Sequence, residues 1–219
     1  MMLEPSRRHP VMCITQDAPA LAHEEQASRL CAAGARWIQL RAKSASRGGR
    51  LRAAREIAAI CRAHDAVFVV DDDVEVALAA GADGVHLGRR DLDWREARRR
   101  LGPRRLLGGT VNDHADAARA RACGVLDYVG VGPLRFTATK AALSPVLGLA
   151  GVRALLEAVG ALPAWVIGGV EASDLPVLRD GGAAGVAVSS ALFRGGDVEA
   201  NLAALAAAWR MSTRIGCPP

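Results

Sequence analysis

A group of potential anion-binding residues follows the apolar segment Tyr128–Val131, which is typical of a buried parallel strand. Gly132 comes directly after this segment, and Thr137, Thr139 and Lys140 follow in the same loop. Backbone N–H groups, hydroxyls and one ammonium together offer many donors with little steric bulk, which suits phosphate or pyrophosphate. The alternative is a solvated loop with a chance lysine. The residues at the other strand ends favour one of these two interpretations.

Three polar side chains lie at the end of a second apolar segment, Trp37–Leu40. Because side chains alternate in direction along a strand, Gln39, Arg41 and Lys43 share one side and Leu40 takes the other. Two cations inside a fold need an anion, since an unpaired buried charge is costly. That anion is either a ligand or an aspartate of a neighbouring strand, and the segment itself leaves both interpretations open.

Carboxylates follow the next two apolar segments. Asp71, Asp72 and Asp73 come after the third segment, and Asp91 comes after the fourth. Consecutive parallel strands place these two loops side by side, so we expect Asp72 and Asp91 to approach each other. Two carboxylates together with a substrate phosphate suit Mg²⁺. Asp73 directly precedes the helical segment Val74–Ala80 and is expected to cap it.

Neutral donors follow the remaining segments. Thr110 comes after two glycines, Gly168 and Gly169 follow the seventh segment, and Ser189 follows the eighth. Small residues here let a ligand approach, and this pairing of loops often forms a phosphate site in barrel enzymes. We therefore expect two anion sites. One, with Arg41, Lys43, Lys140 and the carboxylates, suits a highly charged group bridged by metal; the other, with Gly168, Gly169, Ser189 and the hydroxyls of 137–139, suits a single phosphate.

No Ser-His-Asp or Cys-His grouping occurs among these strand ends. His86 lies inside the fourth apolar segment, and we interpret it as a packed, hydrogen-bonded core histidine rather than a catalytic base.

Short strand-like segments and alanine-rich helical segments alternate along the chain. The expected helices include 50–64, 74–80 and 151–159. Eight strands, each followed by a helix, predict a single-domain α/β fold, the (β/α)8 TIM barrel, over residues 11–210, with an N-terminal arm (1–10) and a flexible tail (211–219). A doubly wound open sheet is the alternative, but no glycine-rich loop follows the first strand. The expected strands are 11–15, 37–40, 67–70, 84–87, 106–109, 128–131, 164–167 and 185–188.

The residues that precede the strands and the net charge of the chain are interpreted as structural rather than functional features. Gly34, Gly81 and Gly182 stand in glycine-alanine turns just before strands, and Asp83 and Asp127, which also precede strands, are interpreted as structural. The chain carries a net charge of +5, partly from arginines between 95 and 105, which we interpret as a solvated helix face rather than a nucleic-acid surface.

Cysteine spacing argues against a disulfide framework or a zinc site, because the five cysteines show no CxxC pair. We see no signal peptide or membrane span and expect a cytoplasmic protein with small phosphorylated substrates and no nucleic-acid or membrane partner. A homodimer is compatible with the sequence, which does not reveal the oligomeric state.

Six segments carry a resemblance to a known family: 34–43, 81–88, 127–133, 137–140, 167–170 and 186–191. Together they resemble the thiamine phosphate synthase family, also called thiamine-phosphate pyrophosphorylases, over roughly residues 11–209. The resemblance implies a TIM barrel that joins a hydroxymethylpyrimidine diphosphate to a hydroxyethylthiazole phosphate and releases thiamine phosphate and pyrophosphate. It implies a dissociative substitution, in which pyrophosphate departs before the thiazole nitrogen captures the pyrimidine cation.

The resemblance also implies a role for each site residue. Arg41, Lys43 and Lys140 would stabilise charge on the leaving group, and Asp72 and Asp91 would hold Mg²⁺. The pyrimidine diphosphate would be bound by Gln39, Leu40, Arg41, Ala42, Lys43, Asp71, Thr110 and Lys140. The thiazole phosphate would be bound by Thr137, Ala138, Thr139, Gly168, Val188 and Ser189.

One departure from the family concerns Asp71–Asp73, where the family usually has Asn-Asp-Arg. Asp71 puts a carboxylate where an amide should contact the diphosphate. The expected consequence is one of three. The diphosphate binds more weakly, a second cation is bound, or Asp71 is protonated or paired with Arg41 or Arg89. The missing arginine is expected to be offset by Arg89 and Arg90.

Two other functions stay open at this point. A thiazole tautomerase of the same superfamily would need neither the paired aspartates nor the diphosphate cations. A non-catalytic barrel would bind a phosphorylated ligand for regulation. The sequence does not distinguish thiazole phosphate from its carboxylated form as substrate.

Overall fold

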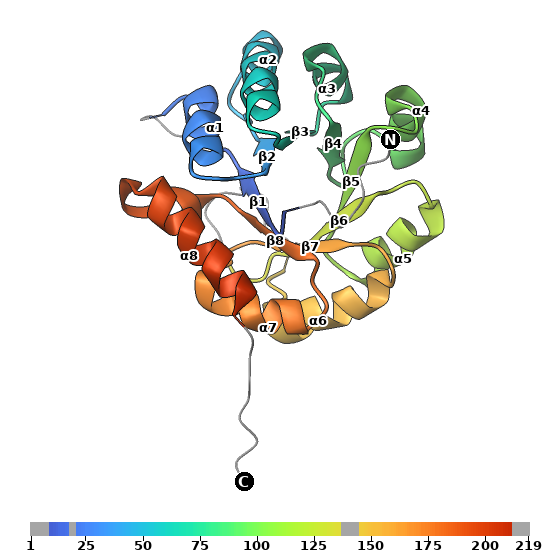
Figure 1. The fold of residues 1–219 in the computed structure, drawn as a ribbon. Coiled ribbons are helices and arrows are strands. Elements are labelled where there is room, and N and C mark those ends of the chain that lie inside the picture. Colours follow the sequence, from blue (N-terminus) through green and yellow to red (C-terminus); the bar gives the residue numbers. More distant parts are fainter. Residues whose placement is uncertain (1–8, 18–20, 137–144, 212–219) are drawn as a thin grey trace.

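A closed barrel of eight parallel strands is the centre of the computed structural model, with helices around its outside (Figure 1). The structure describes residues 9–17, 21–136 and 145–211. The strands follow one another in chain order around the barrel, and β8 closes onto β1 through pairs such as Met12 with Ala187. The predicted (β/α)8 barrel is confirmed, and the open-sheet alternative is wrong.

Among the described residues, strands and helices alternate, apart from two short 3-10 helices. The strands are β1 (Val11–Ile14), β2 (Trp37–Leu40), β3 (Val67–Asp71), β4 (Gly84–Leu87), β5 (Leu106–Val111), β6 (Tyr128–Val131), β7 (Ala164–Ile167) and β8 (Gly185–Val188). The helices are α1 (His23–Ala32), α2 (Arg47–Ala63), α3 (Val74–Ala80), α4 (Trp94–Leu101), α5 (His114–Cys123), α6 (Gly148–Val159), α7 (Leu175–Asp180) and α8 (Val198–Arg210). The 3-10 helices are η2 (Ala172–Asp174) and η3 (Ser190–Gly196).

The observed strand bounds agree with the predicted bounds at five strands and differ from them at three. The first strand ends one residue early, at Ile14, and β3 runs on to Asp71. The fifth strand continues past its two glycines to Val111, because its pairing with β6 reaches Val111 opposite Val131. The extension brings Thr110 into the sheet rather than into a loop.

Two helices begin earlier than expected. The second helix starts at Arg47 and not at Arg50, because the Ser46 hydroxyl accepts a hydrogen bond from Gly49 N at 3.2 Å and caps the first turn. The sixth helix starts at Gly148 instead of Gly151. The third helix has the expected bounds, and it ends at Gly81 in the left-handed conformation (φ +70°), as its glycine-alanine turn predicts.

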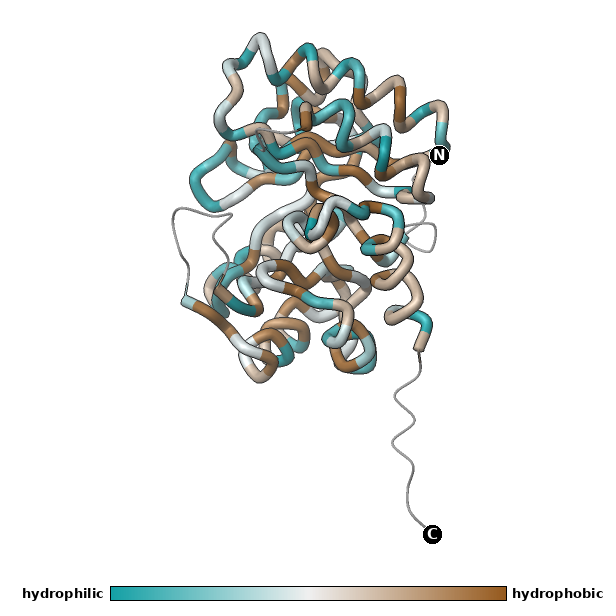
Figure 2. Tube along the Cα trace, turned by 90° about the vertical axis from the view of Figure 1, so that its left-hand side faces the viewer, coloured by the Kyte–Doolittle hydropathy of each residue, from teal (hydrophilic) through white to brown (hydrophobic). Residues whose placement is uncertain are grey.

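Two layers of apolar side chains build the core, as the alternation of each strand requires. Inside the barrel, the rings of Trp37, Tyr128 and Trp165 pack edge to face with centroids 4.8–5.7 Å apart. The larger layer fills the space between the barrel and the helices. Figure 2 shows hydrophobic residues along the central strands and a mixture of hydrophobic and hydrophilic residues along the outer helices.

The aspartates that precede strands are structural, as predicted. Asp83 accepts a hydrogen bond from Phe68 N at 2.8 Å, and Asp127 accepts one from Leu107 N at 2.7 Å. Asp127 also pairs with Arg98 on α4 at 2.5 Å. Within the described ranges, no helix is both long and apolar enough to cross a membrane.

Candidate active site

Two cations and a carboxylate meet at the carboxyl ends of β2 and β3. Gln39 Nε2 donates to Asp71 Oδ1 at 2.9 Å, while Lys43 Nζ lies 3.0 Å and Arg41 Nε 3.8 Å from Asp71 Oδ2. Leu40 and Ala42 pack on the opposite side, in the layer beneath the helices. The predicted alternation is confirmed, and the anion beside the cations in this structure is an aspartate of the neighbouring strand.

Asp71 is an aspartate in an unusual environment. Its side chain is only 11% exposed, and this burial raises its pKa to about 6, helped by the nearby Asp72 carboxylate. Lys43 and Arg41 oppose the shift because they favour the charged form. Of the partners expected for Asp71, Arg41 is near, whereas Arg89 pairs with Asp116 on α5 and with Asp113, which precedes that helix. The expectation that Arg89 pairs with Asp71 is therefore wrong.

The two aspartates expected to hold a metal come together at the rim. Asp72 has a left-handed backbone conformation (φ +67°), and its N–H donates to His86 O on β4 at 2.8 Å. Asp91 accepts a hydrogen bond from Gly88 N at 2.6 Å. Burial raises the pKa of Asp91, and the adjacent Asp72 carboxylate raises it further. The two carboxylates therefore share one site, which Lys43 also contacts through Asp72.

Whether Asp72 and Asp91 can hold a divalent cation depends on which other groups supply ligands. No group of three or more His, Cys, Asp and Glu side chains within residues 9–17, 21–136 and 145–211 is arranged to hold a metal. Two adjacent carboxylates do match the set with which Mg²⁺ is held when substrate phosphate supplies further oxygens. Asp73 takes no part, because it caps α3 at Val76 N (3.0 Å) as predicted and faces Arg50.

Thr110 lies beside these groups on the inner side of β5. Its hydroxyl is 3.0 Å from His86 Nε2, and the His86 ring packs against Tyr128. A side chain at Gly108 would overlap both rings, since its Cβ would lie 2.2 Å from Tyr128 Cζ and 2.6 Å from His86 Nδ1. The prediction of a packed, hydrogen-bonded His86 is confirmed. The sequence does not predict its contact with Thr110, because no local pattern indicates which side chains meet across β4 and β5.

The loops after β6, β7 and β8 form the other half of the mouth. Gly168 (φ +94°) and Gly169 (φ +66°) both need the conformation that glycine favours. The loop after β6 packs closely on them, because Leu134 N donates to Ile167 O and Arg135 N to Gly168 O at 2.8–2.9 Å. Arg135 also binds both carboxylate oxygens of Asp174 at 2.6 and 2.7 Å.

Ser189 is poised at the end of β8 with an unsatisfied hydroxyl. Its Oγ is buried and has no hydrogen-bond partner among the residues that the structure describes. Val188 packs outward against the helices, so only its backbone faces the mouth. Thr137, Ala138, Thr139 and Lys140 lie outside the described residues.

Comparisons with known proteins show the family of this chain. The sequence matches the thiamine monophosphate synthase family over residues 11–192. The chain belongs to this family. A thiamine-phosphate synthase of Bacteroides fragilis is 40% identical over 188 residues, which cover 84% of this chain and 92% of that protein. One from Synechococcus sp. WH7803 is 44% identical over 75% of this chain, which corresponds to 46% of that longer protein.

Solved structures agree with this membership. Thiamine phosphate pyrophosphorylase from Pyrococcus furiosus superimposes with a TM-score of 0.82 at 30% identity, covering 93% of this chain and 97% of that one. A 3-hexulose-6-phosphate synthase, at 20% identity and a TM-score of 0.65, shares the fold alone. As a member of the thiamine monophosphate synthase family, the chain is an enzyme of the transferase class in thiamine biosynthesis.

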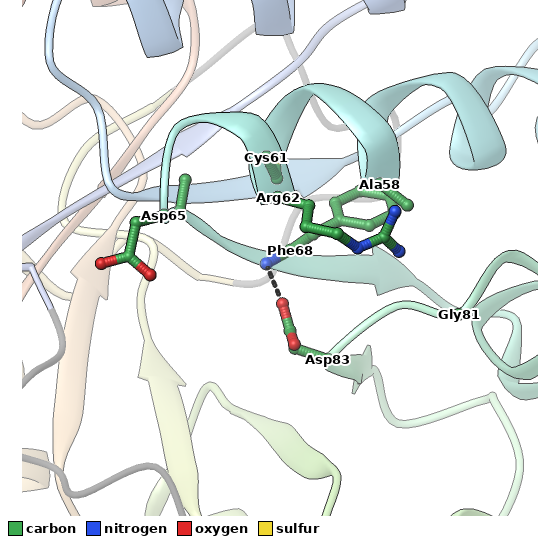
Figure 3. Close-up of a pocket in the computed structure, with 8 residues that line it drawn as sticks. Ala58, Cys61, Arg62, Asp65, Phe68, Gly81 and Asp83 are labelled. Atoms are coloured by element: carbon green, nitrogen blue, oxygen red, sulfur yellow. Dashed lines mark hydrogen bonds between the residues drawn. The ribbon is translucent and has the colours of Figure 1, made fainter.

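A cavity at the other end of the barrel is separate from this mouth. Figure 3 shows its lining residues on α2, at the start of β3 and in the turn before β4. The cavity has a volume of about 200 Å³. Its lining includes Asp83, which holds Phe68 N, and Arg62. This is the face of a TIM barrel where residues serve stability, so the cavity is not the active site of the family.

Proposed function

We propose that the chain condenses a hydroxymethylpyrimidine diphosphate with hydroxyethylthiazole phosphate to give thiamine phosphate and pyrophosphate. The observation that carries the proposal is the division of one barrel mouth into two chemically different halves. Cations and paired carboxylates gather at the ends of β2–β4, whereas glycines and the unsatisfied Ser189 hydroxyl gather at the ends of β7 and β8. The first half suits a diphosphate with a metal ion, and the second suits a single phosphate.

The reaction asks for charge stabilisation rather than for a protein base. The bond from the pyrimidine methylene carbon to the diphosphate oxygen breaks, and a bond from the same carbon to the thiazole nitrogen forms. Arg41 and Lys43, joined by Lys140 from outside the described residues, would hold the diphosphate and stabilise its growing charge. Gln39 and Thr110 would orient it by hydrogen bonds. Leu40 and Ala42 could contribute only backbone contacts, because their side chains face the helices.

A divalent cation belongs to the proposal as an expected cofactor. Asp72 and Asp91 would hold Mg²⁺, which when bound supplies positive charge to the departing pyrophosphate. Lys43 would then exchange its contact with the aspartates for one with the diphosphate. On the other half of the mouth, Gly168, Ser189 and the Val188 backbone would bind the thiazole phosphate together with Thr137, Ala138 and Thr139.

One assay tests the proposal against both alternatives. Purified protein is incubated with the two phosphorylated substrates and Mg²⁺, and thiamine phosphate and pyrophosphate are measured. We expect both products in equal amounts, and we expect neither when Mg²⁺ is removed by a chelator. Thiazole phosphate isomerisation without condensation would indicate a tautomerase, and binding without any turnover would indicate a regulatory barrel.

A further inference from the structure

The turn that carries Asp91 is anchored by a side chain within it. This turn begins at Gly88, whose N–H donates to the Asp91 carboxylate at 2.6 Å. Arg89 extends from the turn to the next helix, where its Nε donates to Asp116 Oδ2 at 2.7 Å and its Nη2 pairs with both Asp113 and Asp116. The turn therefore depends on α5, and not only on its own backbone, for its position.

Asp116 is built to receive this arginine. Its side chain is 8% exposed, and Asp116 Oδ2 also accepts the N–H of Asn112 at 2.8 Å. Asp113 caps α5 by accepting a hydrogen bond from Asp116 N at 2.9 Å. One buried oxygen thus receives donors from two different loops, the turn after β4 and the segment after β5. Losing either donor leaves a charge-assisted hydrogen bond of this oxygen unmade.

Asn112 continues the connection to a third loop. Its side-chain amide donates to the carbonyl oxygen of Gly132, where the loop after β6 begins. Asn112 is itself buried, so this bond is shielded from water. A continuous chain of hydrogen bonds therefore joins the turn of Asp91 to the start of the loop whose later residues belong to the thiazole side.

We propose that Arg89, Asp116 and Asn112 are positioning residues that fix the distance between the metal side and the thiazole side of the mouth. This inference rests on the proposed function, because it assigns the two loops to two substrates. None of the three side chains needs to touch a substrate. Arg89 acts on Asp91, Asn112 acts on the loop after β6, and Asp116 acts on both because one oxygen holds both partners.

Three variants separate these effects. Arg89→Gln is expected to raise the Mg²⁺ concentration for half-maximal rate ~10-fold, since loss of a partner outside the ligands costs metal affinity on that scale. Asn112→Ala is expected to raise the KM for thiazole phosphate several-fold and to leave the Mg²⁺ requirement unchanged. Asp116→Asn, which keeps an oxygen for Asn112 N but loses the charge that Arg89 binds, is expected to raise the Mg²⁺ requirement and to alter the thiazole KM less.

Hydrogen exchange gives a readout that does not depend on activity. Peptides that cover 88–93 should exchange faster in Arg89→Gln and Asp116→Asn, and peptides that cover 132–136 should exchange faster in Asn112→Ala. The matched control is Asp127→Asn, because Asp127 likewise holds a backbone N–H of the β5 region and an arginine, at the opposite end of the barrel. We expect this control to lower the melting temperature without changing the Mg²⁺ requirement or the KM for thiazole phosphate.

The outcomes separate the two proposals. If the native protein forms no thiamine phosphate, the proposed function fails. The exchange experiment still tests whether Arg89, Asp116 and Asn112 hold the two loops in place. If Arg89→Gln leaves exchange of 88–93 unchanged, or if its Mg²⁺ requirement equals that of Asp127→Asn, the positioning role of Arg89, Asp116 and Asn112 is wrong.

Discussion

Lys43 and Asp71 form an ion pair across neighbouring strands, with Nζ 3.0 Å from Oδ2. The same ammonium also contacts Asp72, so the protein's own carboxylates occupy a cation that the proposal assigns to the diphosphate. If the diphosphate binds Lys43 as proposed, Asp71 competes with it for this ammonium.

Asp71→Asn should release Lys43 and strengthen diphosphate binding. Removing one negative charge from beside a bound anion is favourable even at the high effective dielectric of a protein rim. We expect the KM for the pyrimidine diphosphate to fall ~10-fold, measured by steady-state kinetics at saturating thiazole phosphate. The side-chain oxygen of the introduced asparagine can still accept the hydrogen bond that Gln39 donates, so the strand end should keep its conformation.

Asp73→Asn is the matched control for this substitution. It removes the same charge two residues away, and asparagine still caps α3. Its KM for the diphosphate should stay within twofold of the native value. A rise in KM for Asp71→Asn alone would instead identify Asp71 as a ligand adapted to this substrate.

Ser189→Ala should affect binding without affecting stability. The Ser189 hydroxyl has no hydrogen-bond partner among the described residues, so its removal should change the free energy of unfolding by less than about 0.5 kcal/mol. A hydrogen bond from this hydroxyl to a phosphate would contribute about 1.5 kcal/mol or more, so the KM for thiazole phosphate should rise ~10-fold or more.

Ser46→Ala should show the reverse pattern. Ser46 caps α2 through Gly49 N, so its loss should lower the free energy of unfolding by about 1 kcal/mol. The KM for thiazole phosphate should be unchanged, because α2 begins away from the thiazole side. An unchanged thiazole KM in Ser189→Ala would remove Ser189 from the phosphate site.

Gly168→Ala should disturb the contact between two loops of the mouth. A Cβ at this position would lie 2.6 Å from Pro133 Cβ and 2.7 Å from Pro133 Cα, so the loop after β6 would have to move. Gly182→Ala is the control, because Gly182 has the same φ of +94° and a Cβ added there would meet no heavy atom within 4 Å beyond its chain neighbours. Both variants carry a similar backbone strain of about 1–2 kcal/mol.

The difference between these two variants isolates the loop contact. Gly168→Ala should lose more stability in urea unfolding than Gly182→Ala, and it alone should raise the KM for thiazole phosphate. Equal losses, with no change in KM for either variant, would show that the approach of Pro133 to Gly168 does not matter for the site.

The sequence predicts the barrel and the strand ends because each strand is a short apolar segment bounded by turn residues. Alternation within 37–43 correctly separates Gln39 and Lys43 from Leu40. The early starts of α2 and α6 escape prediction because Gly48, Gly49 and Gly148 weaken the helical pattern there.

Contacts between distant residues are what the sequence could not predict. Arg89 and Asp116 lie 27 positions apart on different elements, and no local pattern pairs them. The choice between an anionic ligand and Asp71 as the partner of Lys43 likewise depends on distances across strands. Sequence spacing restricts such partners to one end of the barrel but does not select among them.

Acid should weaken the loop contact that Arg135 and Asp174 form. Burial would raise the pKa of Asp174, but its hydrogen bonds with Arg135 and with Glu171 N outweigh burial and lower this pKa. A carboxyl with a lowered pKa in the folded state adds stability above its ordinary pKa of about 3.9, and this stability is lost as the pH falls through the folded value. Asp174→Asn should therefore reduce the free energy of unfolding by about 1–2 kcal/mol at pH 7, since Arg135 is half-exposed. In urea titrations the gap between the variant and the native protein should narrow below pH 4. A gap that stays constant from pH 7 to pH 3 would mean that the ion pair contributes nothing and that the asparagine acts through packing alone.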